Sequence, residues 1–270
     1  MREQAPRTRT GRRGARALSY RVAQVALVAA ILLAWQIGAS LASNPAFPPF
    51  SRVFESYLGI LFGERLVTDV LPSVARALSG FVIGVVAGAV LGMLIGYWRG
   101  LEPWVRPLLE FLRAIPTVAL LPAALLLLGA TEEMRIGLIA FGCFFAVLLA
   151  AIDGTRRVDP LYYDTSRVVG RSRLETLFRV ALPAALPAIL TGVRIALGLA
   201  LIVMVISELT AASNGIGFYI QQSQRLFRTV DVYAGTLVIG TLGLLFTAAI
   251  LAVERRLLRW HRGWRGSAET

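Results

Sequence analysis

The sequence has 270 residues, of which 56% are hydrophobic and only 16% are charged. A soluble domain usually carries about 25% charged residues, so this composition is not that of a soluble domain. Apolar runs of roughly 20 residues, long enough to cross a bilayer as a helix, recur along the chain. The sequence therefore predicts an all-α polytopic membrane protein.

The formal net charge of +12 comes entirely from arginine, because none of the 28 basic residues is a lysine. On a soluble protein this charge would suggest nucleic acid. Here the arginines gather in particular loops, which indicates membrane topology, and we expect no nucleic-acid partner. A phosphate-binding P-loop requires a lysine, so the chain cannot itself be an ATPase of that type.

The N-terminal residues 1–21 hold seven arginines and few apolar residues, which predicts a disordered basic cytoplasmic tail. The first apolar run is Val22–Leu41. A cleavable signal peptide is the alternative, because Ser40-Leu41-Ala42 resembles a cleavage site. The run exceeds the usual apolar region of about 7–15 residues, and more spans follow, so a retained membrane anchor is favoured.

Further apolar runs predict a total of six spans within a membrane domain over residues 22–254. The other five are expected at Val74–Trp98, Leu108–Leu128 (interrupted by Pro116 and Pro122), Ile136–Ile152, Ala188–Leu209 and Val232–Val253. We expect an interfacial helix over residues 51–62 and a short re-entrant or interfacial helix after the turn Ser213-Asn214-Gly215. Residues 255–270, with a solvated or lipid-facing His261, form a C-terminal tail.

Orientation follows from counting arginines in the loops. Placing the N-terminus inside puts seven arginines in the tail, three in Arg99–Arg113, six in Arg156–Arg179 and five in Arg255–Arg265 on the same side. The opposite loops keep only Arg52, Arg65, Arg135, Arg225 and Arg228. Both termini are therefore expected to be cytoplasmic.

The second span carries a glycine at every fourth position, namely Gly80, Gly84, Gly88, Gly92 and Gly96. Such a ladder removes side chains along one stripe and lets a neighbouring helix approach closely. Tight helix packing is therefore the preferred interpretation, and a glycine-lined conduit is the alternative.

Residues 159–183 are polar and lie between two long apolar segments, so they must project into water. Asp159 is a good N-cap and Pro160 suits the first helical position. Gly170 can end that helix in a left-handed conformation. Ser172 and Glu175 form a capping box that starts a second helix, which should stop near Leu182 because of Pro183, and Pro187 should open the fifth span.

This module resembles the signature of bacterial ABC importer permeases, the EAA motif: Glu-Ala-Ala, three residues, Gly, nine residues, Ile-x-Leu-Pro. Here Asp164-Thr165-Ser166 stand in the first triplet, Gly170 is the glycine and Val180-Ala181-Leu182-Pro183 is the end. The departures are Asp for Glu, Thr-Ser for Ala-Ala and Val for Ile. The stretches RAIPTVALLP and ISELTAASNGIGFYI also resemble the nitrate/sulfonate/taurine branch of these permeases.

The resemblance implies a type I importer permease fold in a bacterial plasma membrane, working as a pair of copies. It implies that two cytoplasmic ATPase subunits, which bind ATP and Mg, dock on the module, and that an extracytoplasmic solute-binding protein delivers a small solute. The residues that it assigns to ATPase coupling are Tyr163, Asp164, Thr165, Ser166, Gly170, Leu182 and Pro183. Membrane lipid is the remaining partner.

Ionisable residues at membrane depth are functional candidates by default. Glu208 ends the fifth span, where it either lines the path or outer gate with Asn214 and Gly215, or is a solvated or salt-bridged helix end. Arg194 is expected to snorkel, and Glu110 is expected to pair with Arg113. Arg225 and Arg228 either attract an anion, contact the binding protein, or are ordinary surface charges.

The sequence shows no metal-ligand cluster, nucleophilic triad or cofactor fingerprint, so we expect no catalytic residue, no metal and no cofactor on this chain. A secondary transporter driven by an ion gradient is the chief rival, although such proteins usually carry internal repeats, which are not evident here. An integral membrane enzyme is the second rival, and it would need clustered catalytic groups.

Overall fold

The computed structural model describes residues 10–42, 44–98 and 100–258, and every regular element in these ranges is a helix. The long helices are α1 Thr10–Ala42, α3 Leu71–Tyr97, α6 Glu132–Arg156, α9 Leu182–Ala211 and α11 Thr229–Leu257. The shorter ones are α2 Phe50–Phe62, α4 Glu102–Ala114, α5 Leu121–Leu128, α7 Pro160–Val168, α8 Arg173–Thr176 and α10 Ile216–Arg225.

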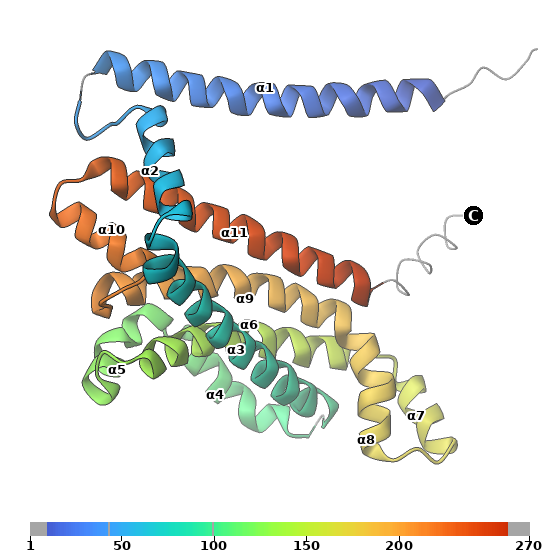
Figure 1. Ribbon diagram of the computed structural model, residues 1–270. Coiled ribbons are helices and arrows are strands. Elements are labelled where there is room, and N and C mark those ends of the chain that lie inside the picture. The colour runs from blue at the N-terminus through green and yellow to red at the C-terminus, as the bar shows by residue number, and fades with distance from the viewer. Residues whose placement is uncertain (1–9, 43, 99, 259–270) are drawn as a thin grey trace, which may run out of the picture.

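The core of the molecule is formed by α3, α6 and α9, with α6 packed against both of the others. Helices α3, α6 and α9 pack together, and the bundle has two ends: the α7 end, which carries α7 and α8, and the α10 end, which carries α2, α5 and α10 (Figure 1). Val147, Ala151 and Met204 are completely buried at this core. Their burial between apolar helices stabilises the packed bundle through close contact of small and branched side chains.

Membrane spans can be identified by length and hydropathy. Among the described residues, five helices are long and apolar enough to cross a membrane, and a sixth span results if α4 and the segment Thr117–Leu128 count as one. These two segments are bent by 80°. The prediction of six spans agrees with this count, and the bend follows Pro116, whose ring disfavours a helical conformation at Ile115.

The helix that leads into the fifth span does not stop at Leu182, and this part of the sequence prediction was wrong. The chain is helical from Arg173 through a π-helical segment, Leu177–Ala181, into α9. The amide of Leu182 donates to the carbonyl of Leu177, which makes this turn wider than an α-helical one. The wider turn admits Pro183, which has no amide proton, without ending the helix, and Pro187 lies inside α9.

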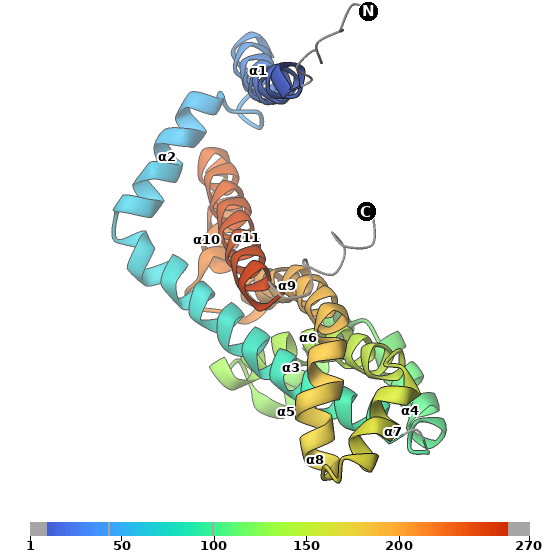
Figure 2. The same cartoon turned by 90° about the vertical axis from the view of Figure 1, so that its right-hand side faces the viewer.

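Helix α1 begins at Thr10, inside the segment that was predicted as a tail without structure. Its apolar part, Val22–Ala42, agrees with the predicted first span. Residues 1–9, and His261 with the rest of 259–270, lie outside the described residues. Only 6% of the apolar part of α1 is buried, and α1 lies apart from α3, α6 and α9 when the bundle is viewed from the α7 end (Figure 2).

Contacts between α1 and the rest of the chain gather around Trp35. Its indole nitrogen donates to the carbonyl of Pro48 at 3.1 Å, and its ring packs on Phe47, Phe50 and Tyr233. The predicted short helices are present as α2 and α10, the latter beginning directly after Gly215.

Candidate functional site

Helix α7 is fixed at both ends by local hydrogen bonds. The Asp159 side chain accepts from the amide of Leu161 at 2.9 Å, as predicted for an N-cap. Gly170 has φ of +76°, and the amides of Gly170 and Arg171 donate to the carbonyls of Arg167 and Ser166. This pair of bonds is a Schellman motif, which satisfies the last carbonyls of the helix and reverses the chain.

The second helix of the module begins with the predicted capping box. The Ser172 hydroxyl accepts from the amide of Glu175 at 3.2 Å, and the Glu175 carboxylate accepts from the amide of Ser172 at 3.1 Å. Because the helix from Arg173 runs unbroken into α9, α7 is attached to a core helix through one tight turn. Leu182 and Pro183 lie within that continuous helix, at the start of α9.

The predicted coupling residues divide between two faces of α7. Tyr163 and Ser166 face the bundle: the Tyr163 hydroxyl donates to the carbonyl of Thr155 at 3.0 Å, its ring packs edge-on against Tyr97, and Ser166 is buried. Asp164 and Thr165 are exposed on the other face.

Exposed apolar side chains accompany the outer face of α7. Leu161, Tyr162, Val168 and Val169 are all exposed, Val168 to 88%. A rigid, capped helix that presents apolar and small polar side chains to water has the properties of a protein-docking surface rather than of a reactive site.

At the α10 end, Glu208 is completely buried in a cluster of ionic and polar groups. Arg76 Nη1 donates to Glu208 Oε1 at 2.8 Å, the Ser73 hydroxyl donates to the same carboxylate at 2.8 Å, and the amide of Gly217 donates to Oε2 at 2.9 Å. Of the two interpretations of Glu208, the structure shows the salt bridge. A part in the outer gate stays a prediction.

The same cluster holds the turn between α9 and α10. Arg76 also donates to the backbone carbonyl of Asn214 at 3.0 Å and to its side-chain oxygen. The amide of Gly215 donates to Asp69 at 3.1 Å, and the amide of Ile216 donates to the Ser73 hydroxyl at 2.8 Å. Asn214 and Gly215 are therefore bound to α3 and the turn that precedes it.

Glu132 and Arg135 of α6 complete the cluster. Arg76 donates to Glu132 at 2.5 and 2.7 Å, Arg135 Nη1 donates to Glu132 at 2.8 Å, and Arg135 Nη2 donates to the carbonyl of Ala211. Arg65 pairs with Asp69 at 3.0 Å. The cluster thus balances three arginines with three carboxylates and ties together the ends of α3, α6 and α9.

Sequence reasoning singled out Glu208 but missed its partners. Arg76, Asp69, Ser73 and Glu132 were not predicted to be part of this cluster. The usable signal was Arg76 itself, because an arginine within an apolar span needs a nearby acid.

The glycine ladder of α3 packs directly against α6. A Cβ atom built on Gly80, Gly84, Gly88, Gly92 or Gly96 would lie between 2.4 and 2.9 Å from an atom of α6, which is too close for any real Cβ contact. At Gly84 and Gly92 the nearest atom is a backbone carbonyl oxygen, at 2.4 Å. These contacts match the interpretation of tight helix packing.

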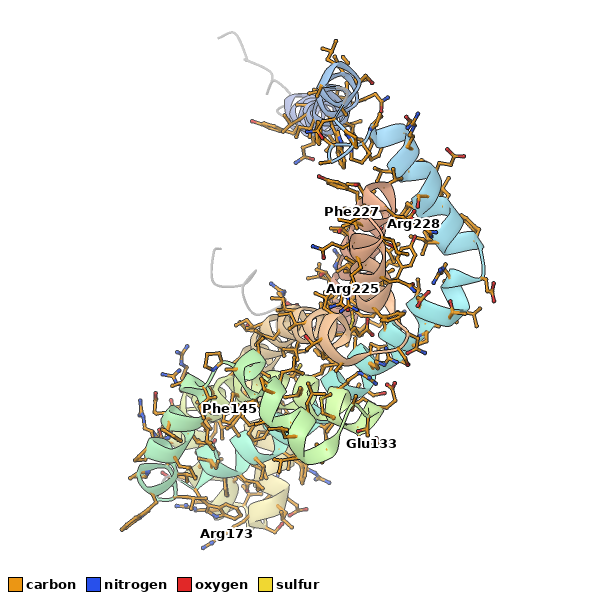
Figure 3. The ribbon with its side chains drawn as sticks, turned by 90° about the vertical axis from the view of Figure 1, so that its left-hand side faces the viewer. Glu133, Phe145, Arg173, Arg225, Phe227 and Arg228 are labelled. Atoms are coloured by element: carbon orange, nitrogen blue, oxygen red, sulfur yellow. The ribbon has the colours of Figure 1, made fainter. Side chains whose placement is uncertain are left out.

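Other candidate residues lie away from these two sites. Arg194 pairs with Glu254 at 2.5 Å on the surface of the bundle, and Arg113 pairs with Glu110 at 2.6 Å as expected. Arg225 ends α10, and Phe227 and Arg228 lie just before the start of α11 (Figure 3); all three side chains are exposed. Cys143 is buried, and its thiol contacts the carbonyl of Ala196.

Five described helices, or up to six, that are long and apolar enough to cross a membrane make this a multi-span membrane protein. Residues 65–259 match the profile of the family described as "Binding-protein-dependent transport system inner membrane component". This match covers well over half of the chain. The chain belongs to that family, and it is the permease subunit of an ABC importer, with ATP hydrolysed on a separate subunit.

Relatives support the same assignment. The chain is 36% identical over 208 residues to the "Probable ABC transporter permease protein" of Brucella melitensis, a match that covers 77% of this chain and 85% of that protein. It is 33% identical to the taurine transport system permease protein TauC of Escherichia coli, which covers 88% of this chain and 89% of the relative. It is 30% identical to the bicarbonate transport system permease protein CmpB of Synechococcus elongatus, a match that covers 84% of this chain and 86% of that protein.

A solved structure with the same fold is the inward-facing MetNI methionine ABC transporter. The matched chain superposes with a TM-score of 0.53 at 22% sequence identity, covering 68% of this chain and 95% of that one. The family profile begins at residue 65, so α1 and α2 lie outside the matched segment.

Proposed function

We propose that this permease carries a small solute along a pathway that it encloses with a second copy of itself, driven by ATPase subunits that dock on α7. The observation that carries the proposal is the α7 module. Its N-cap at Asp159, its left-handed Gly170 and its capping box at Ser172 hold an exposed helix rigidly on α9. Closure of a docked partner would therefore rotate α9 instead of bending a loop.

The arginine distribution supports a cytoplasmic position for the α7 end and for both termini. The arginines of 156–179 flank α7 and α8, and Arg255 and Arg256 end α11 on the same side. ATP and Mg would then be bound by the partner ATPase on that side, and a solute-binding protein would dock at the α10 end.

Dense packing within one chain supports a pathway between two copies. Ile139, Val147 and Met204 are completely buried where α6 meets its neighbours, so a solute has no route through this core. We therefore place the path along the surface of the bundle, where another chain would complete it. The largely exposed α1 offers apolar surface for contact with that copy and with lipid.

The solute is proposed from the relatives alone. Permeases with similar sequences are named for taurine, aliphatic sulfonates and bicarbonate. These are small, oxygen-rich compounds, and we place nitrate, sulfonates, taurine and similar solutes in the same proposed range.

Reconstituted uptake tests the proposed function. The permease, its ATPase and its binding protein are placed in vesicles, and uptake of radiolabelled taurine, an alkanesulfonate and bicarbonate is measured with ATP. We expect uptake that stops when the ATPase carries a substitution that prevents hydrolysis. Unchanged uptake with that inactive ATPase, or uptake that follows an imposed ion gradient, would instead identify a gradient-driven transporter.

Substitution at Gly170 tests the coupling role of α7. In Gly170→Leu, a side chain must occupy φ of +76°, which costs roughly 1–2 kcal/mol in the left-handed region, although no atom lies within 4 Å to clash with it. We expect normal membrane insertion, ATP hydrolysis by the assembly, and transport reduced at least tenfold.

Gly170→Asn is the matched control, because asparagine tolerates the left-handed conformation. It should keep most of the transport activity. Equal transport by Gly170→Leu and the unaltered protein would contradict the role given to this turn.

A further inference from the structure

Helix α4 belongs to the segment that crosses the bundle between α3 and α6. Helix α3 ends at Tyr97 at the α7 end, and α6 begins with Glu132 at the α10 end, so the chain between them has to travel the full length of the bundle (Figure 1). It does so as α4, a break at Ile115–Pro116, and α5, with an 80° bend between the halves. Counted as one broken span, this segment has α4 as its half at the α7 end.

One face of α4 packs against the core. Leu109 is buried, and Val105 and Leu112 pack with it against Ile95 and Phe145. The described residues leave most of the two flanks beside this face uncovered.

The first flank is charged. Glu102, Arg106, Glu110 and Arg113 follow one another at intervals of three and four residues and form a ladder of ion pairs. Arg106, Glu110 and Arg113 keep 65%, 43% and 49% of their side-chain surface exposed. Glu102 differs, because it is buried and also pairs with Arg156 at the end of α6.

The second flank is apolar. Trp104, Leu108 and Phe111 are exposed to 85%, 55% and 66%. At about 100° per residue, these side chains centre roughly opposite the charged ladder on the helix. The apolar flank can face hydrocarbon at little cost, whereas the charged flank cannot.

Charged side chains are costly in hydrocarbon, so in a membrane span the charged flank is favoured on the side of water. Its apolar flank then faces lipid. This pattern suits a helix that lies between lipid on one side and water on the other, next to the break at Ile115–Pro116.

We propose that the charged ladder of α4 lines the cytoplasmic half of the solute pathway and that its two exposed arginines attract small anions. This inference rests on the proposed function and names the wall of its pathway. The exposed part of the ladder carries Arg106 and Arg113 against Glu110, which leaves one net positive charge per copy. Glu102 does not cancel that charge, because Arg156 neutralises it.

The bend gives the ladder a defined end. Arg113 occupies the last turn of α4, and Thr117 begins the short helical segment after the break. An anion that enters the ladder meets Arg113 where the span changes direction. Arg113 therefore marks the site at which carboxylate, sulfonate or nitrate oxygens would be bound, by charge-assisted hydrogen bonds from the guanidinium.

Thiol labelling tests which flank faces water. The chain has one cysteine, Cys143, which is buried, so the unaltered protein should not react with a membrane-impermeant methanethiosulfonate. In permeabilised membranes containing the whole importer, Glu110→Cys and Arg113→Cys should react. The matched controls Leu108→Cys and Phe111→Cys, on the same helix, should react at least tenfold more slowly because lipid covers them.

The anion preference is measured at Glu110→Cys with two reagents of similar size, the anionic sulfonatoethyl and the cationic trimethylammonioethyl methanethiosulfonate. Arg106 and Arg113 flank this position and attract the anionic reagent. The ratio of the anionic to the cationic reaction rate should therefore be roughly tenfold higher here than for a free thiol in solution. Adding Arg113→Met should remove most of that preference.

Each result decides the inference. Equal labelling of both flanks, or no labelling of either, overturns the placement of the ladder in the pathway. Labelling of the charged flank with no effect of Arg113→Met on the reagent preference overturns the anion site. Stimulation of the ATPase by the unaltered permease is measured in the same membranes, so a failed inference is separable from a failed proposed function.

Discussion

Replacing Arg76 with methionine (Arg76→Met) should destabilise the folded bundle by about 3–5 kcal/mol. The substitution leaves Glu208 fully buried and without its ionic partner, and it also removes the bonds to Glu132 and Asn214. An uncompensated buried carboxylate is among the most destabilising lesions in a protein interior. The expected result is a large fall in the apparent Tm of the protein in detergent. This Tm is measured by size-exclusion chromatography of heated samples.

Two further variants show whether the buried charge is the cause. Arg76→Met combined with Glu208→Gln should recover part of the lost stability, because no unpaired carboxylate is then left. Arg194→Met breaks the exposed pair with Glu254 and should cost less than about 1 kcal/mol. A fall in Tm for Arg76→Met no larger than that for Arg194→Met would show that the cluster is not structural.

Replacing Gly84 with leucine (Gly84→Leu) should separate α3 from α6 and cost about 3 kcal/mol or more. Even its Cβ would lie 2.4 Å from the carbonyl oxygen of Ala140 and 2.7 Å from Cys143 Cβ. Backbone cannot move aside like the end of a flexible side chain, so the two helices have to part along the stripe. We expect little folded protein in a fluorescence-detected size-exclusion profile.

Gly137→Leu is the matched control, since Gly137 lies on α6 and no atom is within 4 Å of its Cβ position. It should give as much folded protein as the unaltered chain. If the two variants behaved alike, the glycine ladder would not be the close contact between the helices.

The local features of this fold were predictable from the sequence, because short-range rules determine them. The N-cap at Asp159, the left-handed Gly170 and the Ser172–Glu175 capping box each depend on neighbouring residues, and all three are confirmed. The six-span pattern followed from hydropathy for the same reason. The glycine spacing alone indicated close packing, but the identity of α6 as the partner came only from the structure.

Two parts of the chain show where local rules end. Pro183 was expected to stop a helix, yet the wider turn of Leu177–Ala181 accommodates it, and that choice depends on how α9 packs. The partners of Glu208 lie on other helices, and no spacing rule connects a glutamate with an arginine on another span. The charged and apolar flanks of α4 could be derived from the sequence. The bend after α4 was only suggested by the prolines, and the structure was needed to show it.

The distances along the chain between Arg76 and its acids have a consequence for biogenesis. Glu132 follows it by 56 residues and Glu208 by 132. During synthesis, α3 leaves the ribosome with an unpaired arginine and a bare glycine stripe before α6 and α9 exist. Arg76 can pair with Glu132 once α6 has been made, but the full cluster around Glu208 forms only after α9, the last core helix to be translated.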